Sequence, residues 1–108
     1  MKDFGIIEMQ QIQQCLLKNY QDKWQPICAE SGQSKLLWMI GEIGEVIDII
    51  KKHGGTAATE DIVFRKKLVE ELADVLMCYN EVLMCYGIAA DELERAYREK
   101  FTRNMERW

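Results

Sequence analysis

The sequence predicts an all-α protein, and three features of the 108-residue chain lead to that expectation. Apolar residues recur at spacings of three and four, as on one face of a helix, and not at the alternating spacing of a strand. Only one proline and seven glycines interrupt these patterns. The length is that of a single domain, 1–108, which buries about two-thirds of its unfolded surface. We therefore expect one four-helix bundle that oligomerisation completes.

The first helix is expected from about residue 4 to residue 23, and a loop at 24–32 that contains Pro26 follows it. A second helix is expected from residue 33 or 34 to Lys52, because Gly54 and Gly55 stop it. The apolar stripe of the first helix is Met9, Ile12, Leu16 and Tyr20. The stripe of the second is Leu36, Ile40, Ile43, Ile47 and Ile50. We expect both stripes to face the core.

The third helix is expected to end at Gly87, which suits a left-handed cap. Its seam is Leu68, Leu72, Val75, Tyr79, Val82 and Tyr86. The preceding residues 56–65 fit a loop, a lead-in helix from near Thr59, or a flap. The fourth helix is expected from about Ala90 to Arg107. It carries one stripe of apolar side chains, which are Tyr97, Phe101, Met105 and Trp108, and a polar stripe beside it.

The charge and the cysteine content indicate which partners and which cellular compartment to expect. Acidic residues outnumber basic ones by 18 to 14, which gives no broad support for a partner that is nucleic acid or an anionic membrane. The four cysteines include no Cys-x-x-Cys pair and the chain has one histidine, so we expect reduced thiols, mostly in the core, and no zinc site. The first eleven residues include Asp3 and Glu8 and lack the long apolar segment of a signal peptide. We expect a cytoplasmic protein.

Two pairs of acids stand out within the apolar patterns of the second and third helices. Glu42 and Glu45 are three residues apart, as are Glu71 and Asp74, so each pair shares a helix face. Two unit charges about 6 Å apart repel by roughly 3 kcal/mol at an effective dielectric constant of 20. Four clustered carboxylates beside a core therefore indicate that a cation neutralises them.

An all-oxygen set of ligands suits a hard divalent cation, Mg²⁺ first and Mn²⁺ second. A di-iron bundle would need Glu-x-x-His pairs, and His53 falls after its helix. Magnesium held by carboxylates commonly takes phosphate oxygens as further ligands, which favours phosphate-ester chemistry. No glycine-rich phosphate loop of the Walker type occurs, which argues against a P-loop enzyme. Glu81 is a further candidate ligand, although we expect it to be exposed.

The polar stripe of the fourth helix could grip a polyphosphate. Lys100, Asn104 and Arg107 follow spacings of four and three, so two cations and an amide share a face. By spacing alone, a solvated face is an equal alternative for this stripe. Trp38 is a candidate substrate contact one helical turn before Glu42, with a core position as its more common role.

Three segments resemble the MazG-type nucleoside triphosphate pyrophosphohydrolases, the all-α group that includes dCTP pyrophosphatases. They are residues 35–46 (KLLWMIGEIGEV), 70–76 (EELADVL) and 100–108 (KFTRNMERW). The resemblance implies a helical bundle that assembles as a homodimer or homotetramer. It also implies Mg²⁺-dependent hydrolysis between the α and β phosphates, which yields a nucleoside monophosphate and pyrophosphate in nucleotide-pool housekeeping.

Carried over by position, the resemblance makes magnesium ligands of Glu42, Glu45, Glu71 and Asp74. Either of the first two, or a water they hold, activates the nucleophile, so Glu42 and Glu45 are the catalytic candidates. Phosphate and sugar contacts fall on Lys100, Asn104 and Arg107, which could come from a neighbouring subunit. Many members of the group carry an acid where this chain has Gly41.

Two alternatives remain open. Phosphoribosyl-ATP pyrophosphohydrolases usually carry a Glu-Glu-Ala-x-Glu motif with an upstream Ser-Tyr-Thr stretch, and this chain has neither. In the other alternative, the chain is a non-enzymatic helical module whose acidic face docks a basic partner. Joint stabilisation by metal and nucleotide distinguishes an enzyme site from such a docking face.

Overall fold

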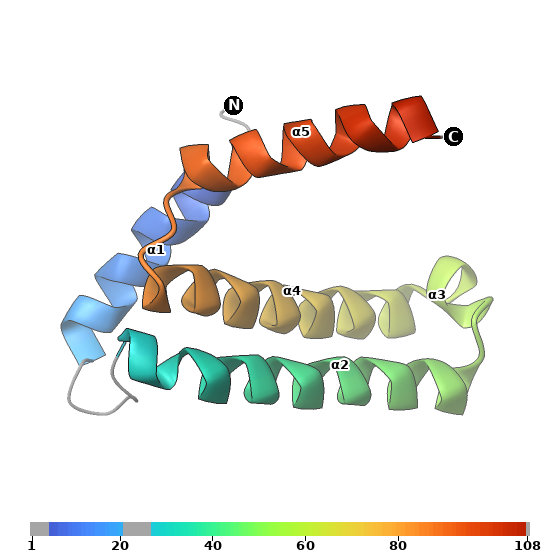
Figure 1. Ribbon diagram of the computed structural model, residues 1–108. Coiled ribbons are helices and arrows are strands. Elements are labelled where there is room, and N and C mark those ends of the chain that lie inside the picture. Colours follow the sequence, from blue (N-terminus) through green and yellow to red (C-terminus); the bar gives the residue numbers. More distant parts are fainter. Residues whose placement is uncertain (1–4, 21–26, 108) are drawn as a thin grey trace.

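The computed structural model describes residues 5–20 and 27–107, without the side chains of residues 16–20. Figure 1 shows the elements in chain order. They are α1 (Ile6–Tyr20), the short 3-10 helix η1 (Ala29–Ser31), α2 (Gly32–His53), α3 (Ala57–Glu60), α4 (Ile62–Cys85) and α5 (Ala90–Arg107). The described residues contain no strand, so the all-α prediction is confirmed.

The helix boundaries follow the predicted ones closely where the structure describes them. The fourth predicted helix coincides with α5, and α2 begins one residue before the predicted range. Of the alternatives for residues 56–65, the chain forms the short helix α3 and then begins α4 at Ile62. The part of the predicted loop at 24–26, and Trp108 of the α5 stripe, lie outside the described residues.

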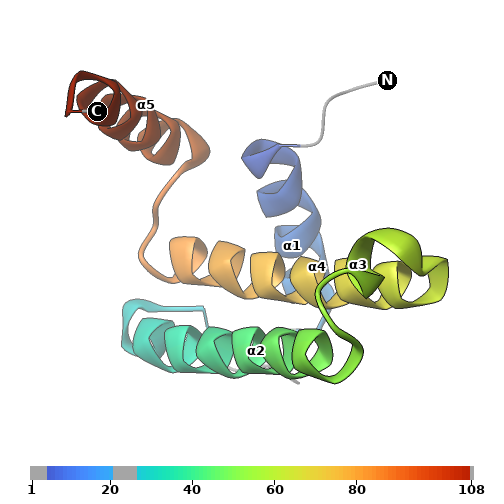
Figure 2. The same ribbon diagram turned by 90° about the vertical axis from the view of Figure 1, so that its right-hand side faces the viewer.

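Helices α2 and α4 lie side by side along their length and form the centre of the molecule (Figures 1 and 2). Gly54, with φ of 84°, ends α2 and donates its N–H to the carbonyl of Ile50. Asp61 begins α4, because its carboxylate accepts from the N–H groups of Val63 and Phe64. A short connection of this kind makes the two helices antiparallel neighbours.

One row of less exposed residues on each helix marks the seam between α2 and α4. On α4 the residues of this row recur at alternating intervals of four and three, as in a coiled coil. They are Phe64, Leu68, Glu71, Val75, Cys78, Val82 and Cys85. On α2 they are Lys35, Met39, Glu42, Val46 and Ile49. Glutamates 42 and 71 therefore lie within the α2–α4 seam and not at the margin of the core.

The predicted core stripe of α2 lies elsewhere. Its five residues, from Leu36 to Ile50, are 36 to 62% exposed. The expectation that this stripe faces the core is therefore wrong for the single chain. The helix is apolar on two faces, and α4 covers the neighbouring face that includes Met39 and Val46. Periodicity predicted the helix correctly, but it could not say which of two apolar faces α4 covers.

Helix α1 packs across α4 with a polar side inward. Gln13 is 7% exposed, whereas Ile12 of the predicted stripe is 61% exposed. The amide of Asn80, which is 1% exposed, donates to the carbonyl of Met9 at 3.3 Å. Leu16 and Tyr20 of that stripe lie outside the described side chains. The expected α1 stripe is wrong at Ile12, because hydrogen bonds to α4 turn the neighbouring face inward.

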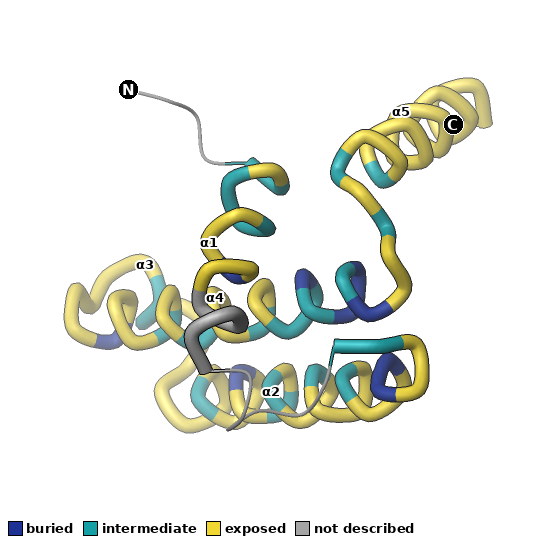
Figure 3. The backbone as a smooth tube through the Cα atoms, turned by 90° about the vertical axis from the view of Figure 1, so that its left-hand side faces the viewer, coloured by how far each residue is buried: buried dark blue, intermediate teal, exposed yellow. Residues whose placement is uncertain are grey.

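Helix α5 turns away from the rest of the chain. The axes of α4 and α5 are bent by 108° at the break between them, where Gly87 has φ of 64°. Figure 3 shows α5 exposed along almost its whole length. Its apolar stripe is 59 to 74% exposed at Tyr97, Phe101 and Met105. Within one chain, α5 therefore leaves its apolar stripe unburied.

The molecule is more open than a compact domain of its size. Its radius of gyration is 16.4 Å, whereas about 13 Å is usual for 100 residues. Its accessible surface is 8778 Å², and about 6,200 Å² is usual for a folded monomer of this mass.

Among the described helices, none alone is long and apolar enough to cross a bilayer, and α4 with α5 meets that measure only as a bent pair.

The cysteines are free thiols, as expected. Cys85 is buried, Cys28 and Cys78 are intermediate, and Cys15 is exposed. Cys15 is the exposed exception to the expectation of mostly core thiols, because the face of α1 that turns inward carries Gln13 instead.

Candidate metal and nucleotide site

Three of the four predicted acids gather between α2 and α4. One carboxylate oxygen from each of Glu42, Glu45 and Glu71 lies within 4.8 Å of the other two. Glu42 and Glu71 are partly buried in the seam, and Glu45 is exposed at its margin. The antiparallel pairing of α2 and α4 is what brings together residues almost thirty positions apart in the chain.

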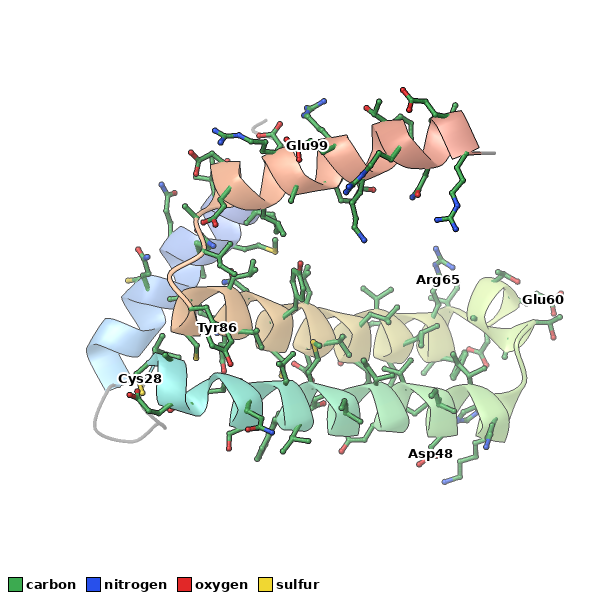
Figure 4. The ribbon with its side chains drawn as sticks, in the orientation of Figure 1. Cys28, Asp48, Glu60, Arg65, Tyr86 and Glu99 are labelled. Carbon is green, nitrogen blue, oxygen red and sulfur yellow. The ribbon has the colours of Figure 1, made fainter. Side chains whose placement is uncertain are left out.

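Asp48 marks the opposite side of α2. It lies one turn after Glu45 in the sequence, yet it points away from α4 in Figure 4. An acid on α2 therefore does not lie in the cluster merely because it is close to Glu45 in the sequence. Asp48 provides a matched control for the acids of the cluster.

Asp74 lies near the three glutamates but outside their group. It is exposed, and it is not among the residues whose oxygens approach within 4.8 Å. Its charge nevertheless contributes to the raised pKa of Glu45. The structure thus places the fourth predicted ligand beside the cluster, within electrostatic range of it.

The carboxylates repel one another, and the pKa of Glu45 is raised as a result. The negative charge of Glu42 is the largest cause that raises the pKa of Glu45 above 4.5. Desolvation, the charge of Glu71, a hydrogen bond with Glu42 and the charge of Asp74 raise this pKa further, in that order. A proton or a cation between these side chains relieves the repulsion.

The donor set fits a hard divalent cation. All three ligand atoms are carboxylate oxygens, which Mg²⁺ and Mn²⁺ prefer to sulfur or nitrogen. Two oxygens on opposite sides of a magnesium ion lie about 4.2 Å apart, so the observed separation needs only small side-chain adjustments. Glu42, Glu45 and Glu71 therefore fit the predicted metal.

Trp38 lies beside this cluster. Its indole N–H donates to Oε1 of Glu42 at 3.2 Å, and the residue is 68% exposed. A core position for Trp38 is therefore wrong in the single chain. The exposed ring, held next to a candidate ligand, is available for contact with a substrate or with another chain.

The predicted phosphate-binding residues lie apart from the cluster. Lys100, Asn104 and Arg107 are all exposed on α5. Figures 1 and 2 both show α5 diverging from the α2–α4 pair that holds the acids. One chain therefore does not bring the cationic stripe and the carboxylates together.

One polar cluster was not anticipated from the sequence. The ammonium of Lys35 lies 3.0 Å from Oε2 of Glu81, and both side chains are largely buried, with exposures of 13 and 15%. Glu81 was expected to be exposed, which is wrong because Lys35 and Gln13 enclose its carboxylate. The sequence did contain one signal for this pair, which is its spacing from the predicted ligands. Lys35 precedes Glu42 by seven residues and Glu81 follows Asp74 by seven, so each lies on the same helix face as a predicted ligand.

The family comparison agrees with this geometry. Residues 30–107 match the family model described as the MazG nucleotide pyrophosphohydrolase domain. The matched range contains α2, α4 and α5, and with them every predicted ligand and phosphate contact. No curated protein and no solved structure gives a significant match.

Proposed function

Because the chain belongs to the MazG nucleotide pyrophosphohydrolase family, we propose that it hydrolyses a nucleoside triphosphate, in ribose or deoxyribose form, to the monophosphate and pyrophosphate. The observation that carries this proposal is the approach of three carboxylate oxygens to within 4.8 Å in the α2–α4 seam. The enzyme would act in nucleotide-pool housekeeping. Its cytoplasmic location stays a prediction.

The acids have two roles in this proposal. Glu42, Glu45, Glu71 and the nearby Asp74 hold Mg²⁺, which when bound polarises phosphoryl oxygens and lowers the pKa of a coordinated water. Glu45 lies at the exposed margin of the cluster, where its carboxylate would accept a proton from the attacking water. Glu42 is the second candidate for this role, and its carboxylate accepts a hydrogen bond from the indole of Trp38.

A second copy of the chain would complete the site. The excess of exposed surface over a compact monomer is about 2,500 Å², which is in the range that one subunit buries in a stable oligomer. The uncovered faces are apolar on α2 and α5, with Ile40 at 62% and Tyr97 at 74% exposed. We infer a homodimer or homotetramer in which these faces are covered.

In such an oligomer the α5 of one copy would reach the acids of another. Lys100, Asn104 and Arg107 would then neutralise the phosphate charge that builds up during the reaction. This arrangement accounts for the separation of the two predicted halves of the site within one chain, while each lies on an exposed surface.

The direct test is a panel of canonical, deoxy and modified nucleoside triphosphates with Mg²⁺, with pyrophosphate and orthophosphate measured separately. We expect pyrophosphate and monophosphate in equal amounts from one or a few substrates. Orthophosphate alone would place cleavage at the outer phosphate and contradict the proposal. No product from any nucleotide would favour the non-enzymatic docking module instead.

Two isosteric variants of α2 provide the control. Glu45→Gln keeps the shape of the side chain but removes a ligand and a proton acceptor, so we expect turnover to be lost. Asp48→Asn removes the same charge one turn later, on the side of α2 that points away from α4. It should keep near-normal turnover. An equal loss in both variants would mean that total charge, and not the cluster, matters.

A further inference from the structure

A polar network crosses three helices near the C-terminal end of α4. Lys35 of α2 pairs with Oε2 of Glu81 at 3.0 Å. From the other side, the amide of Gln13 on α1 donates to Oε1 of Glu81 at 2.8 Å. Gln13 is 7% exposed, and both ionic side chains are nearly as well covered. The network is therefore a built feature of the interior and not a surface ion pair.

This network continues the seam that holds the carboxylates. Lys35 lies two helical turns before Glu42 on α2, and Glu81 lies two turns after Asp74 on α4. Two turns correspond to about 10 Å along a helix axis. Cys78 falls between Asp74 and Glu81 on α4. Burial is the largest cause that raises the pKa of its thiol, the charges of Glu81, Glu42 and Asp74 raise it further, and Lys35 lowers it.

A purely structural role would not require these charges. Two well-packed apolar residues of similar volume usually stabilise a protein as well as a buried ion pair does. Within the described part of the chain, the network also has hydrogen-bond donors and acceptors that its own contacts do not use. The ammonium has three N–H groups and the carboxylate about four acceptor sites, and the two contacts above use only some of them. The carbonyl oxygen of the Gln13 amide is a further acceptor.

We propose that Gln13, Lys35 and Glu81 recognise the nucleobase of the substrate whose phosphates lie at the carboxylate cluster. This inference rests on the proposed function, because it takes the position of the phosphates from it. A separation of two helical turns is comparable to the reach from the α-phosphate to the base in an extended nucleotide. The network presents acceptors beside donors, which matches the adjacent donors and acceptors on the edge of a base.

The inference predicts a loss of base selectivity when the network is changed. The experiment measures kcat/KM with Mg²⁺ for triphosphates of several bases, each in ribose and deoxyribose form. In Glu81→Gln, the ratio of kcat/KM between the best and the poorest base should fall about tenfold or more, because a pair of hydrogen bonds to the edge of a base is what distinguishes the right base from the wrong one. The value of kcat for the remaining substrates should change less than KM.

The matched control is Glu94→Gln. Glu94 also forms an ion pair, with Arg98 at 2.9 Å, but both side chains are at least 60% exposed on α5. This variant should keep the base preference of the wild type. A second variant guards against simple unfolding: the apolar pair Lys35→Met with Glu81→Leu removes the charges while it keeps the volume. It should fold and yet have lost its base preference.

Other results would overturn the inference. If all nucleotides lose activity by the same factor in Glu81→Gln and the apolar pair keeps the base selectivity of the wild type, the network is only a clamp between helices. A change in the ratio of ribose to deoxyribose substrates, with the base ratio unchanged, would assign the network to the sugar. Binding of α,β-imido triphosphates is measured in parallel, so that base-selective binding without turnover contradicts the proposed reaction and not this inference. Binding without any base preference contradicts the inference itself.

Discussion

At the scale of single residues, the electrostatics of Glu45 predict how the metal-free protein responds to pH. Its pKa is raised above 4.5 in the folded chain, chiefly by the charge of Glu42. The folded state therefore holds this proton more tightly than the unfolded state. The resulting stabilisation is complete below 4.5 and is lost as the pH rises through the raised pKa.

The variant Glu45→Gln removes this titration. In a chelator at neutral pH, we expect it to melt at a higher temperature than the wild type, because one repelling charge is gone. Mg²⁺ should stabilise the wild type more than the variant. Thermal unfolding from neutral pH down to 4.5 measures both effects, and the difference between the proteins should shrink as the pH falls. A variant that melts lower than the wild type at neutral pH would contradict the repulsion.

Gly32 offers a prediction about packing. It is buried at the first turn of α2, and a Cβ at this position would overlap the aromatic ring of Tyr86 at the end of α4. We expect Gly32→Ala to lower the free energy of unfolding by about 1–3 kcal/mol, because the ring has to move. Urea denaturation measures this loss.

The comparison for Gly32 is Gly41→Ala, in the middle of the same helix. A Cβ there meets no atom within 4 Å, so alanine should raise stability by about 0.5–1 kcal/mol. Equal destabilisation of the two variants would contradict the close approach of Tyr86 as the cause. It would also indicate that another chain covers Gly41.

At the scale of elements, the beginning of α4 depends on Asp61. Its Oδ1 accepts from the N–H of Val63 at 3.0 Å and from the N–H of Phe64 at 3.2 Å. Asp61→Ala should lower the free energy of unfolding by about 1 kcal/mol, and Asp61→Asn should preserve most of it. Chemical denaturation of both variants checks the difference. If Asp61→Asn lowers the free energy of unfolding as much as Asp61→Ala does, the cap is not the source of the stability.

This prediction also separates stability from function. Glu71 lies almost three turns after Asp61 on the same helix, well beyond the reach of its cap. We therefore expect Asp61→Ala to bind Mg²⁺ with unchanged affinity at a temperature where it is folded. The short helix α3, which packs on α4, orients the entry of the chain but contributes no residue to the cluster.

At the scale of the whole molecule, the proposed contact between the α5 of one copy and the acids of another can be tested by mixing two variants that we expect to be inactive. Glu45→Gln lacks a functional acid cluster, and Arg107→Ala lacks a cation of the α5 stripe. If each site combines the acids of one copy with the α5 of another, a mixed oligomer contains one intact site. We expect activity to return after the two variants are unfolded and refolded together.

The control is each variant refolded alone, with sedimentation velocity to establish that the mixed sample is oligomeric. An oligomeric mixture that stays inactive would mean that α5 acts on the acids of its own chain. A monomeric wild type would contradict the inferred homo-oligomer directly.

Much of the local structure could be predicted from the sequence, because local structure depends on neighbours in the chain. The helical spacing of three and four, the glycines after α2 and α4, and the limits of α5 all follow from interactions within a few residues. The ligand pairs were recognisable for the same reason, since Glu42 with Glu45, and Glu71 with Asp74, share a face whatever the partner helix is.

The tertiary structure decided which faces meet, and this depends on competition between surfaces. Helix α2 has two apolar faces, so its pattern could not show that the one with Met39 and Val46 packs on α4 while Ile40 stays exposed. Nor could α1 show that Gln13 turns inward, because the reason is a carboxylate on a distant helix.

By itself, the sequence determined an all-α chain with paired carboxylates and the family to which it belongs. Only the folded chain decided that Glu42, Glu45 and Glu71 converge, that Lys35 and Glu81 extend their seam, and that α5 stands apart. The physical reason is range. Helix formation and capping are satisfied within a turn or two, whereas burial and ion pairing are satisfied by whichever surfaces the whole molecule brings into contact.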